Sequence, residues 1–150
     1  MYNAYMPSPC GLIQICASAR GVTAIRFVEE KSAPASPSPV TDLTCQQLRE
    51  YFSGNRHEFT LPLDAAGTAF QHSVWEALTH IPFGETRTYG DIAQCIDNPK
   101  AVRAVGLANG KNPLSIVVPC HRVIGANGTL TGYAGGLVRK AALLKLEGVM

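Results

Sequence analysis

Residues 88–110, TYGDIAQCIDNPKAVRAVGLANG, are the stretch that decides the fold. Thr88 can cap a short helix, with Asp91 three residues later as the second half of a capping box. Asn98 and Pro99 are residue types preferred at the N-cap and at the first position of a second helix, which the final Asn-Gly pair would end. Two short helices separated by a brief turn, the second with basic residues, predict a helix-turn-helix.

The segment that follows predicts the rest of a winged domain. Residues 114–118 form an apolar run of β type. The pair Asn127-Gly128 is the strongest short signal for a hairpin, and a hairpin after a helix-turn-helix is a wing. Gly136 opens and Gly148 ends a last helix. Its expected buried positions are apolar: Leu137, Ala141, Leu143 and Leu144.

The chain before residue 88 divides in two. Apolar residues at helical spacing, Trp75 among them, predict a helix over residues 70–81. Further upstream the patterns predict two strands in residues 11–28, a Pro/Ser loop in 31–39, a helix in 42–53 and an edge strand in 59–63. We therefore expect a small α/β domain in residues 1–65 and a second domain in residues 66–150.

The composition indicates a globular protein, with 46% hydrophobic and 16% charged residues. No apolar run approaches the roughly 20 residues that a membrane span needs, and the N-terminus lacks signal-peptide features, so we expect a cytoplasmic protein. Five cysteines at irregular spacing do not form a disulfide framework. Without a Cys-x-x-Cys pair, and with scattered histidines, the sequence predicts no metal site.

Charge is unevenly distributed along the chain. Between Asp97 and Glu147 there is no acidic residue. That interval contains seven basic residues: Lys100, Arg103, Lys111, Arg122, Arg139, Lys140 and Lys145. Charge of one sign suits a polyanionic partner such as DNA, although a modestly basic solvated surface would have the same composition.

Cys120 is the candidate for chemistry, within Pro119-Cys120-His121-Arg122. Positive charge on the two residues that follow would favour the thiolate, and a thiolate is a strong nucleophile toward an alkyl carbon. Neighbouring side chains on a strand point to opposite faces, so direct contact between Cys120 and His121 does not follow. A reactive cysteine and a buried cysteine beside a surface histidine both remain open at this point.

The sequence around Cys120 resembles the active-site signature of the O6-alkylguanine-DNA alkyltransferases. Further motifs of that family occur in order over residues 68–148: Pro82-Phe83-Gly84-Glu85, Thr88-Tyr89, Arg103-Ala104-Val105-Gly106, Asn112-Pro113, Pro119 through Gly125, Gly132-Tyr133-Ala134-Gly135-Gly136 and Leu146-Glu147-Gly148. The resemblance implies an α+β protein. It would have a ribonuclease H-like N-terminal domain and a C-terminal winged helix-turn-helix domain.

The resemblance also implies roles for individual residues. Cys120 would take the alkyl group from O6-alkylguanine irreversibly, in a single turnover. His121 would act as general base through a water, oriented by Glu147. Asn112 would brace the active-site turn. No cofactor is needed, because the cysteine itself accepts the alkyl group, and O4-alkylthymine is a possible second substrate.

The implied partner is double-stranded DNA that contains O6-alkylguanine, bound in its minor groove with the damaged base flipped out. Arg103 would enter the space that the base leaves. Its helix is expected to have one nearly smooth face, which would allow close approach to the groove and is formed by Ala101, Ala104 and Ala108 with Gly106 nearby. Tyr89 would contact a phosphate and the flipped base. Tyr133, the Ala134 amide and the carbonyl groups of Cys120 and Val123 would line the base pocket. We expect a monomer with no obligate protein partner and no membrane contact.

Three other classes of protein share parts of this pattern. A winged-helix transcription regulator needs the basic helix but not Cys120. A cysteine hydrolase needs Cys and His but also an oxyanion hole. A non-catalytic sensor of alkylated DNA resembles this family but has another residue in place of the nucleophile.

Overall fold

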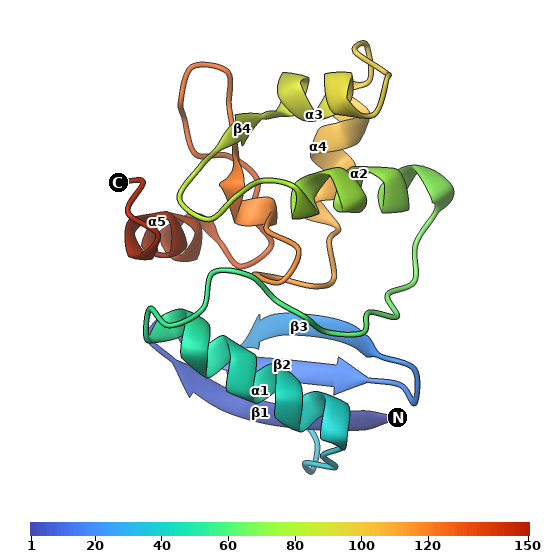
Figure 1. Ribbon diagram of the computed structural model, residues 1–150, viewed down its shortest axis with the longest axis vertical. Helices are drawn as coiled ribbons and strands as arrows, with labels where there is room; N and C mark the ends of the chain where they lie inside the picture. The colour runs from blue at the N-terminus through green and yellow to red at the C-terminus, as the bar shows by residue number, and fades with distance from the viewer. The chain divides into compact units, whose positions relative to one another are not determined.

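Three antiparallel strands and one helix form the first part of the chain (Figure 1). The strands are β1 (Tyr2–Ser8), β2 (Gly11–Ala17) and β3 (Val22–Val28), in the order β1-β2-β3. β1 was not predicted, because its sequence alternates weakly and contains a proline, yet it pairs with β2 along its whole length. The segment is extended because it forms hydrogen bonds with β2, and not because its own residues strongly favour a strand.

Helix α1 (Pro39–Phe52) packs on this sheet and begins three residues before the predicted start. Its N-cap is Ser38, which exchanges capping-box hydrogen bonds with Thr41, and Pro39 occupies the first turn without losing a hydrogen bond. Leu48 and Tyr51 are fully buried, as the helical spacing predicted. Leu43, expected on the same face, is exposed.

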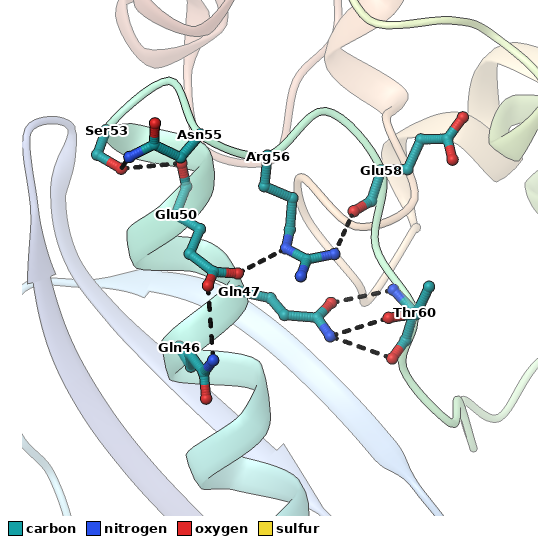
Figure 2. A network of polar contacts seen from close by, with 8 residues as sticks. All are labelled: Gln46, Gln47, Glu50, Ser53, Asn55, Arg56, Glu58 and Thr60. Atoms are coloured by element: carbon teal, nitrogen blue, oxygen red, sulfur yellow. Dashed lines mark hydrogen bonds and ion pairs between the residues drawn. The ribbon is translucent and has the colours of Figure 1, made fainter.

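The segment after α1 does not form the edge strand expected in residues 59–63. A single parallel bridge joins Val22 to Leu63. Side chains hold the segment instead, as Figure 2 shows. The Gln47 amide of α1 donates to the carbonyl of Thr60 at 3.2 Å and accepts from its backbone N–H at 3.0 Å, while Arg56 pairs with Glu50 at 2.8 Å. The two Gln47 bonds satisfy backbone groups of Thr60 that a strand would otherwise pair.

The structure, a computed structural model, describes residues 1–150 and separates them into two compact units, Met1–Ala66 and Gly67–Met150. The second unit begins with α2 (Ala69–Thr79), capped by Thr68. Trp75 is buried as expected, and its indole donates to the carbonyl of Ala108 at 2.8 Å. None of the helices has both the length and the hydrophobicity to cross a lipid bilayer.

The predicted helix-turn-helix is present as α3 (Tyr89–Cys95) and α4 (Val102–Gly110) (Figure 1). Thr88 caps α3 with Asp91 as its capping-box partner, as predicted. The expected start of the second helix is wrong. Asn98 and Pro99 lie in the turn, where Asp97 adopts a left-handed φ of 57°, and α4 begins after Ala101 without a side-chain cap.

The expected wing is mostly irregular. The predicted turn forms at residues 125–129, where the N–H of Gly128 binds the carbonyl of Gly125. The strand before it, β5 (Val123–Ile124), pairs in parallel with β4 (Arg87–Thr88) rather than with a returning hairpin strand. The last helix is α5 (Leu137–Leu146), which buries Leu143 and Leu144. Leu137, expected in that stripe, is 49% exposed, and Lys140 is buried in its place.

Candidate active site

The turn that precedes Cys120 replaces a predicted strand. Residues 114–118 form tight turns in which Ile116 takes a φ of 73°, an unfavourable conformation for a β-branched side chain. Asn112, almost fully buried, supplies the hydrogen bonds that hold this turn. Its amide donates to the carbonyl of Val118 at 2.8 Å and accepts from the N–H of Leu114 at 3.0 Å. The run is apolar because it is buried, not because it is a strand.

Cys120 begins a short 3₁₀ helix, Cys120–Arg122, labelled η1. The cysteine is 1% exposed, and its carbonyl accepts from the N–H of Val123 and, at 3.5 Å, from the Asn109 amide. Burial raises the pKa of the thiol to about 11, against the opposing effects of the Asn112 side chain and the Lys140 charge. The free protein therefore holds a protonated thiol, and the expected thiolate-favouring effect of His121 and Arg122 does not dominate.

Glu147 explains why those two neighbours contribute little positive potential. Its carboxylate accepts from the Nε and Nη2 atoms of Arg122 at 2.8 and 3.0 Å, and Oε2 lies 2.7 Å from Nε2 of His121. The N–H of Gly84 binds Oε1 at 3.2 Å. Glu147 is the C-cap of α5 and is buried, not a solvated helix end. A buried ion pair of this kind neutralises the guanidinium locally.

His121 is fully buried and oriented by Glu147. Burial lowers the pKa of the imidazole more than the carboxylate raises it, so the neutral form predominates at pH 7. A neutral imidazole whose Nε2–H donates to a carboxylate carries its lone pair on Nδ1. In this structure Nδ1 has no hydrogen-bond partner. The ring can therefore accept a proton on that side.

Arg122 belongs to the same cluster, although sequence reasoning gave it no role there. Besides Glu147, the guanidinium binds the carbonyl of Ile81 at 2.7 Å and lies 5.8 Å from the centre of the Phe83 ring. The Pro82-Phe83-Gly84 motif is thus tied to η1 through one side chain. The sequence places Arg122 directly after His121. It does not indicate that both side chains point toward Glu147, as they do in the structure.

Tyr89 opens α3 and is half-buried. Its hydroxyl lies 3.1 Å from both the carbonyl oxygen and the Oγ1 atom of Thr131. Gly132, with a φ of 51°, and Tyr133 follow; Tyr133 is buried and the next residue, Ala134, is exposed. The structure therefore places Tyr89 against the loop that carries Tyr133 and Ala134. Thr131 was not singled out in the sequence.

Helix α4 presents an exposed face that differs from the expected one. Arg103 and Ala104 are exposed, and Arg103 makes no hydrogen bond or ion pair. Gly106 is half-buried, with the Tyr89 ring 3.9 Å from the position of an added Cβ, and Ala101 is the N-cap. Ala108 packs inward against α2, so it does not extend the smooth face. The exposed surface includes Val102 and Leu107 instead.

The basic residues between Asp97 and Glu147 do not all lie at the surface. Arg122 and Lys140 are buried, at 5% and 0% exposure. The remaining five basic residues reach the surface: Lys100, Arg103, Lys111, Arg139 and Lys145. Fewer positive charges are therefore available to a polyanion than the sequence count indicates. Arg122 and Lys140 instead make hydrogen bonds inside the protein, to Glu147 and to Thr131. No group of three or more His, Cys, Asp or Glu side chains is placed to hold a metal ion.

Comparison with known proteins matches both units of the chain. Residues 69–149 match the family described as 6-O-methylguanine DNA methyltransferase, DNA binding domain, and residues 1–65 match its ribonuclease-like domain. The chain is 51% identical to a methylated-DNA–protein-cysteine methyltransferase of Methanosarcina acetivorans, over 99% of each chain. It is 50% identical to the protein of that name from Mycobacterium tuberculosis, over 93% of this chain and 88% of the relative.

Solved structures agree with these matches. The structure of Mycobacterium tuberculosis OGT in complex with DNA superposes with a TM-score of 0.89 at 49% identity, covering 98% of this chain and 92% of the other. Atl1 of Schizosaccharomyces pombe (S. pombe), in complex with damaged DNA containing O6-carboxymethylguanine, is 36% identical. It covers 54% of this chain and 77% of its own, with a TM-score of 0.50.

Proposed function

The chain belongs to the methylated-DNA–protein-cysteine methyltransferase family and repairs DNA by transferring an alkyl group to a cysteine, and we propose that Cys120 is that cysteine. The observation that carries this proposal is the buried thiol at the start of η1, adjoining an imidazole that Glu147 orients. We assign the chemistry and DNA binding to residues 66–150, and a separate α/β domain to residues 1–65.

The transfer is a displacement at the alkyl carbon. The Cys120 sulfur forms a bond to that carbon while the bond from carbon to O6 of guanine breaks, and the electron pair passes to the base. The thiol proton leaves through a water to Nδ1 of His121, which is the unprotonated nitrogen when Nε2 faces Glu147. The product is a thioether, which is not readily hydrolysed, so each molecule reacts once.

Activation of the thiol depends on the arrangement around it. Because burial holds the pKa of Cys120 at about 11, a base must remove the proton as the substrate arrives. Burial keeps His121 neutral and therefore able to accept that proton. Asn112 keeps the preceding turn in the conformation that presents Cys120. In the free protein the thiol is therefore protonated and reacts slowly with other alkylating agents, and it becomes reactive in the complex with DNA.

We propose that DNA approaches the exposed face of α4. The O6 atom is not accessible to the thiol within a stacked duplex, so the base must flip out, and Arg103 is free to fill its place. Ala101, Ala104 and Gly106 add little bulk to this helix, whereas Val102 and Leu107 are the larger side chains that DNA would meet on it. Tyr89 would exchange its bond to Thr131 for one to the flipped nucleotide and could supply the proton that the departing guanine needs.

The base would rest against Tyr133, with O6 near the Ala134 amide and the exocyclic amine near the Val123 carbonyl. The Cys120 carbonyl, which the sequence also favoured, already accepts the N–H of Val123, so Val123 is the stronger candidate. We further propose that the protein acts as a cytoplasmic monomer with access to chromosomal DNA, and that O4-alkylthymine is a secondary substrate.

The decisive experiment is to incubate the protein with a duplex that contains O6-methylguanine and to map its peptides by mass spectrometry. A methyl group on Cys120 at one per molecule supports the proposal, and Cys120→Ser should bind the duplex without accepting methyl. Tight binding with unmodified Cys120 would identify a lesion sensor instead. Methylation of Cys95, the exposed cysteine, in place of Cys120 would contradict the site assignment.

A further inference from the structure

Lys140 lies on the inner face of α5 with none of its surface exposed. Its ammonium group donates to one acceptor, the carbonyl oxygen of Thr131, and no carboxylate pairs with it. A buried ammonium group has three donors and a high desolvation cost, so an isolated lysine in this position needs a compensating role. The sequence placed Lys140 among residues suited to DNA, which its burial contradicts.

The Thr131 carbonyl oxygen accepts hydrogen bonds from both Lys140 and Tyr89. The Tyr89 hydroxyl donates to the Thr131 oxygen at 3.1 Å, and its second contact at 3.1 Å is to the Thr131 hydroxyl. Tyr89 comes from α3, and Lys140 comes from α5. One backbone oxygen therefore joins two helices of the second unit at the loop that leads to Tyr133.

Lys140 is also electrostatically coupled to the nucleophile. Burial lowers the pKa of Lys140 to about 8, and the charge of Cys120 raises it in opposition. In return, the Lys140 charge lowers the pKa of the Cys120 thiol. Ionisation of the Cys120 thiol and protonation of Lys140 therefore favour each other. The effect is stronger between buried groups than it would be at the surface.

We propose that Lys140 and Thr131 are positioning residues for alkyl transfer, in which the Thr131 carbonyl couples the Tyr89 hydroxyl of α3 to the Lys140 ammonium group of α5. This inference rests on the proposed function, since it assumes that Cys120 reacts and that Tyr89 meets the flipped nucleotide. When Tyr89 turns toward DNA, the carbonyl is left to Lys140 alone. Occupation of the site by a base is thus connected to the hydrogen bonding of Lys140.

A double-mutant cycle tests the coupling. Single-turnover methyl transfer from a duplex is measured for wild type, Tyr89→Phe, Lys140→Met and the double variant. We expect each single change to slow transfer about tenfold, or about 1.4 kcal/mol. We expect the double variant to be slowed about twentyfold instead of the roughly hundredfold that independent effects predict. Independent effects would overturn the inference.

Lys145→Met is the matched control, because Lys145 is on the same helix and exposed. It removes the same charge without touching Thr131, so its effect should multiply with that of Tyr89→Phe. Thr131→Val keeps the carbonyl and removes the hydroxyl, so the coupling should persist in that background. Loss of coupling in Thr131→Val would show that the carbonyl is not the link.

A second readout separates an electrostatic role from a merely structural one. The rate at which iodoacetamide alkylates Cys120 is followed by peptide mapping from pH 6 to 10, below the Cys120 pKa of about 11, where the rate follows the small thiolate fraction. Lys140→Met should react more slowly than wild type below pH 8, where the ammonium group is charged, and should approach wild type above pH 8. Lys145→Met should match wild type throughout. Equal profiles would overturn the electrostatic part. Circular dichroism checks folding, and Lys140→Gln provides a second neutral variant if Lys140→Met does not fold.

These outcomes are distinct from failure of the proposed function. If wild-type Cys120 receives no methyl group from the duplex, the function itself is wrong. If Cys120 is methylated but the cycle is multiplicative, the function stands and the role of Thr131 and Lys140 does not.

Discussion

Replacing Glu147 with glutamine should both destabilise the protein and slow the reaction. The carboxylate holds four hydrogen bonds, two from Arg122 and one each from His121 and Gly84. Glutamine has the same shape, but its NH₂ group cannot accept from Arg122 or from the Nε2–H of His121, and it has no charge. Breaking one side of a buried ion pair costs about 3–5 kcal/mol, because the other charge stays buried without a partner.

That loss is a large part of a typical unfolding free energy of about 5–15 kcal/mol, so the variant should fold but unfold at lower urea concentration. Transfer should slow by about 100-fold or more, because the His121 ring loses the group that sets its tautomer. Glu85→Gln is the control. Its pair with Arg87 at 3.1 Å is exposed, so we expect a change of about 0–1 kcal/mol.

Urea unfolding followed by circular dichroism, and single-turnover transfer at a temperature where both variants are folded, measure the two effects. A loss below about 1 kcal/mol for Glu147→Gln would refute the account of the buried pair. Transfer within threefold of wild type would refute the role of Glu147 in orienting His121. Glu147→Asp, which keeps the charge, should recover part of the stability.

Four further predictions follow from other parts of the site. Arg103→Ala should slow repair in duplex DNA far more than reaction with a free O6-alkylguanine base, and equal slowing of both would remove its role in base flipping. The pKa of Cys120 is about 11 when folded and 9.0 ordinarily, so stability present below pH 9 should be lost as pH rises toward 11; urea titrations should show a smaller loss in Cys120→Ser. The pKa of Lys140 is instead depressed from 10.5 to about 8, so the unfolded state binds more protons in between, and unfolding measurements from pH 8 to 9 should show wild type gaining stability relative to Lys140→Met. Trp75→Phe should lower the unfolding free energy by about 1–2 kcal/mol through the lost bond to Ala108, measured by urea unfolding against Phe70→Leu on the same helix.

Sequence patterns predicted those features that depend only on residues close together in the chain. The capping box at Thr88, the buried face of α1 at Leu48 and Tyr51, and the core position of Trp75 all follow from residue type and spacing. The predicted start of the second helix at Asn98 was wrong. Asp97 adopts a left-handed conformation, so Asn98 lies in the turn and α4 begins after Ala101. The missed strand β1 depends on β2 for its pairing, which no local pattern contains.

The sequence by itself determined the family, the helix-turn-helix and the identity of the candidate nucleophile, because ordered motifs and helical periodicity are properties of the chain. Tertiary structure alone decided how charge is distributed around Cys120. Residues 25 or more positions apart meet there, so that Glu147 cancels the charge of Arg122, while burial keeps His121 neutral in spite of that carboxylate. It also turned Lys140 inward toward Thr131, a placement that depends on how α5 packs. Burial sets the pKa of each group, and burial exists only after the chain has folded.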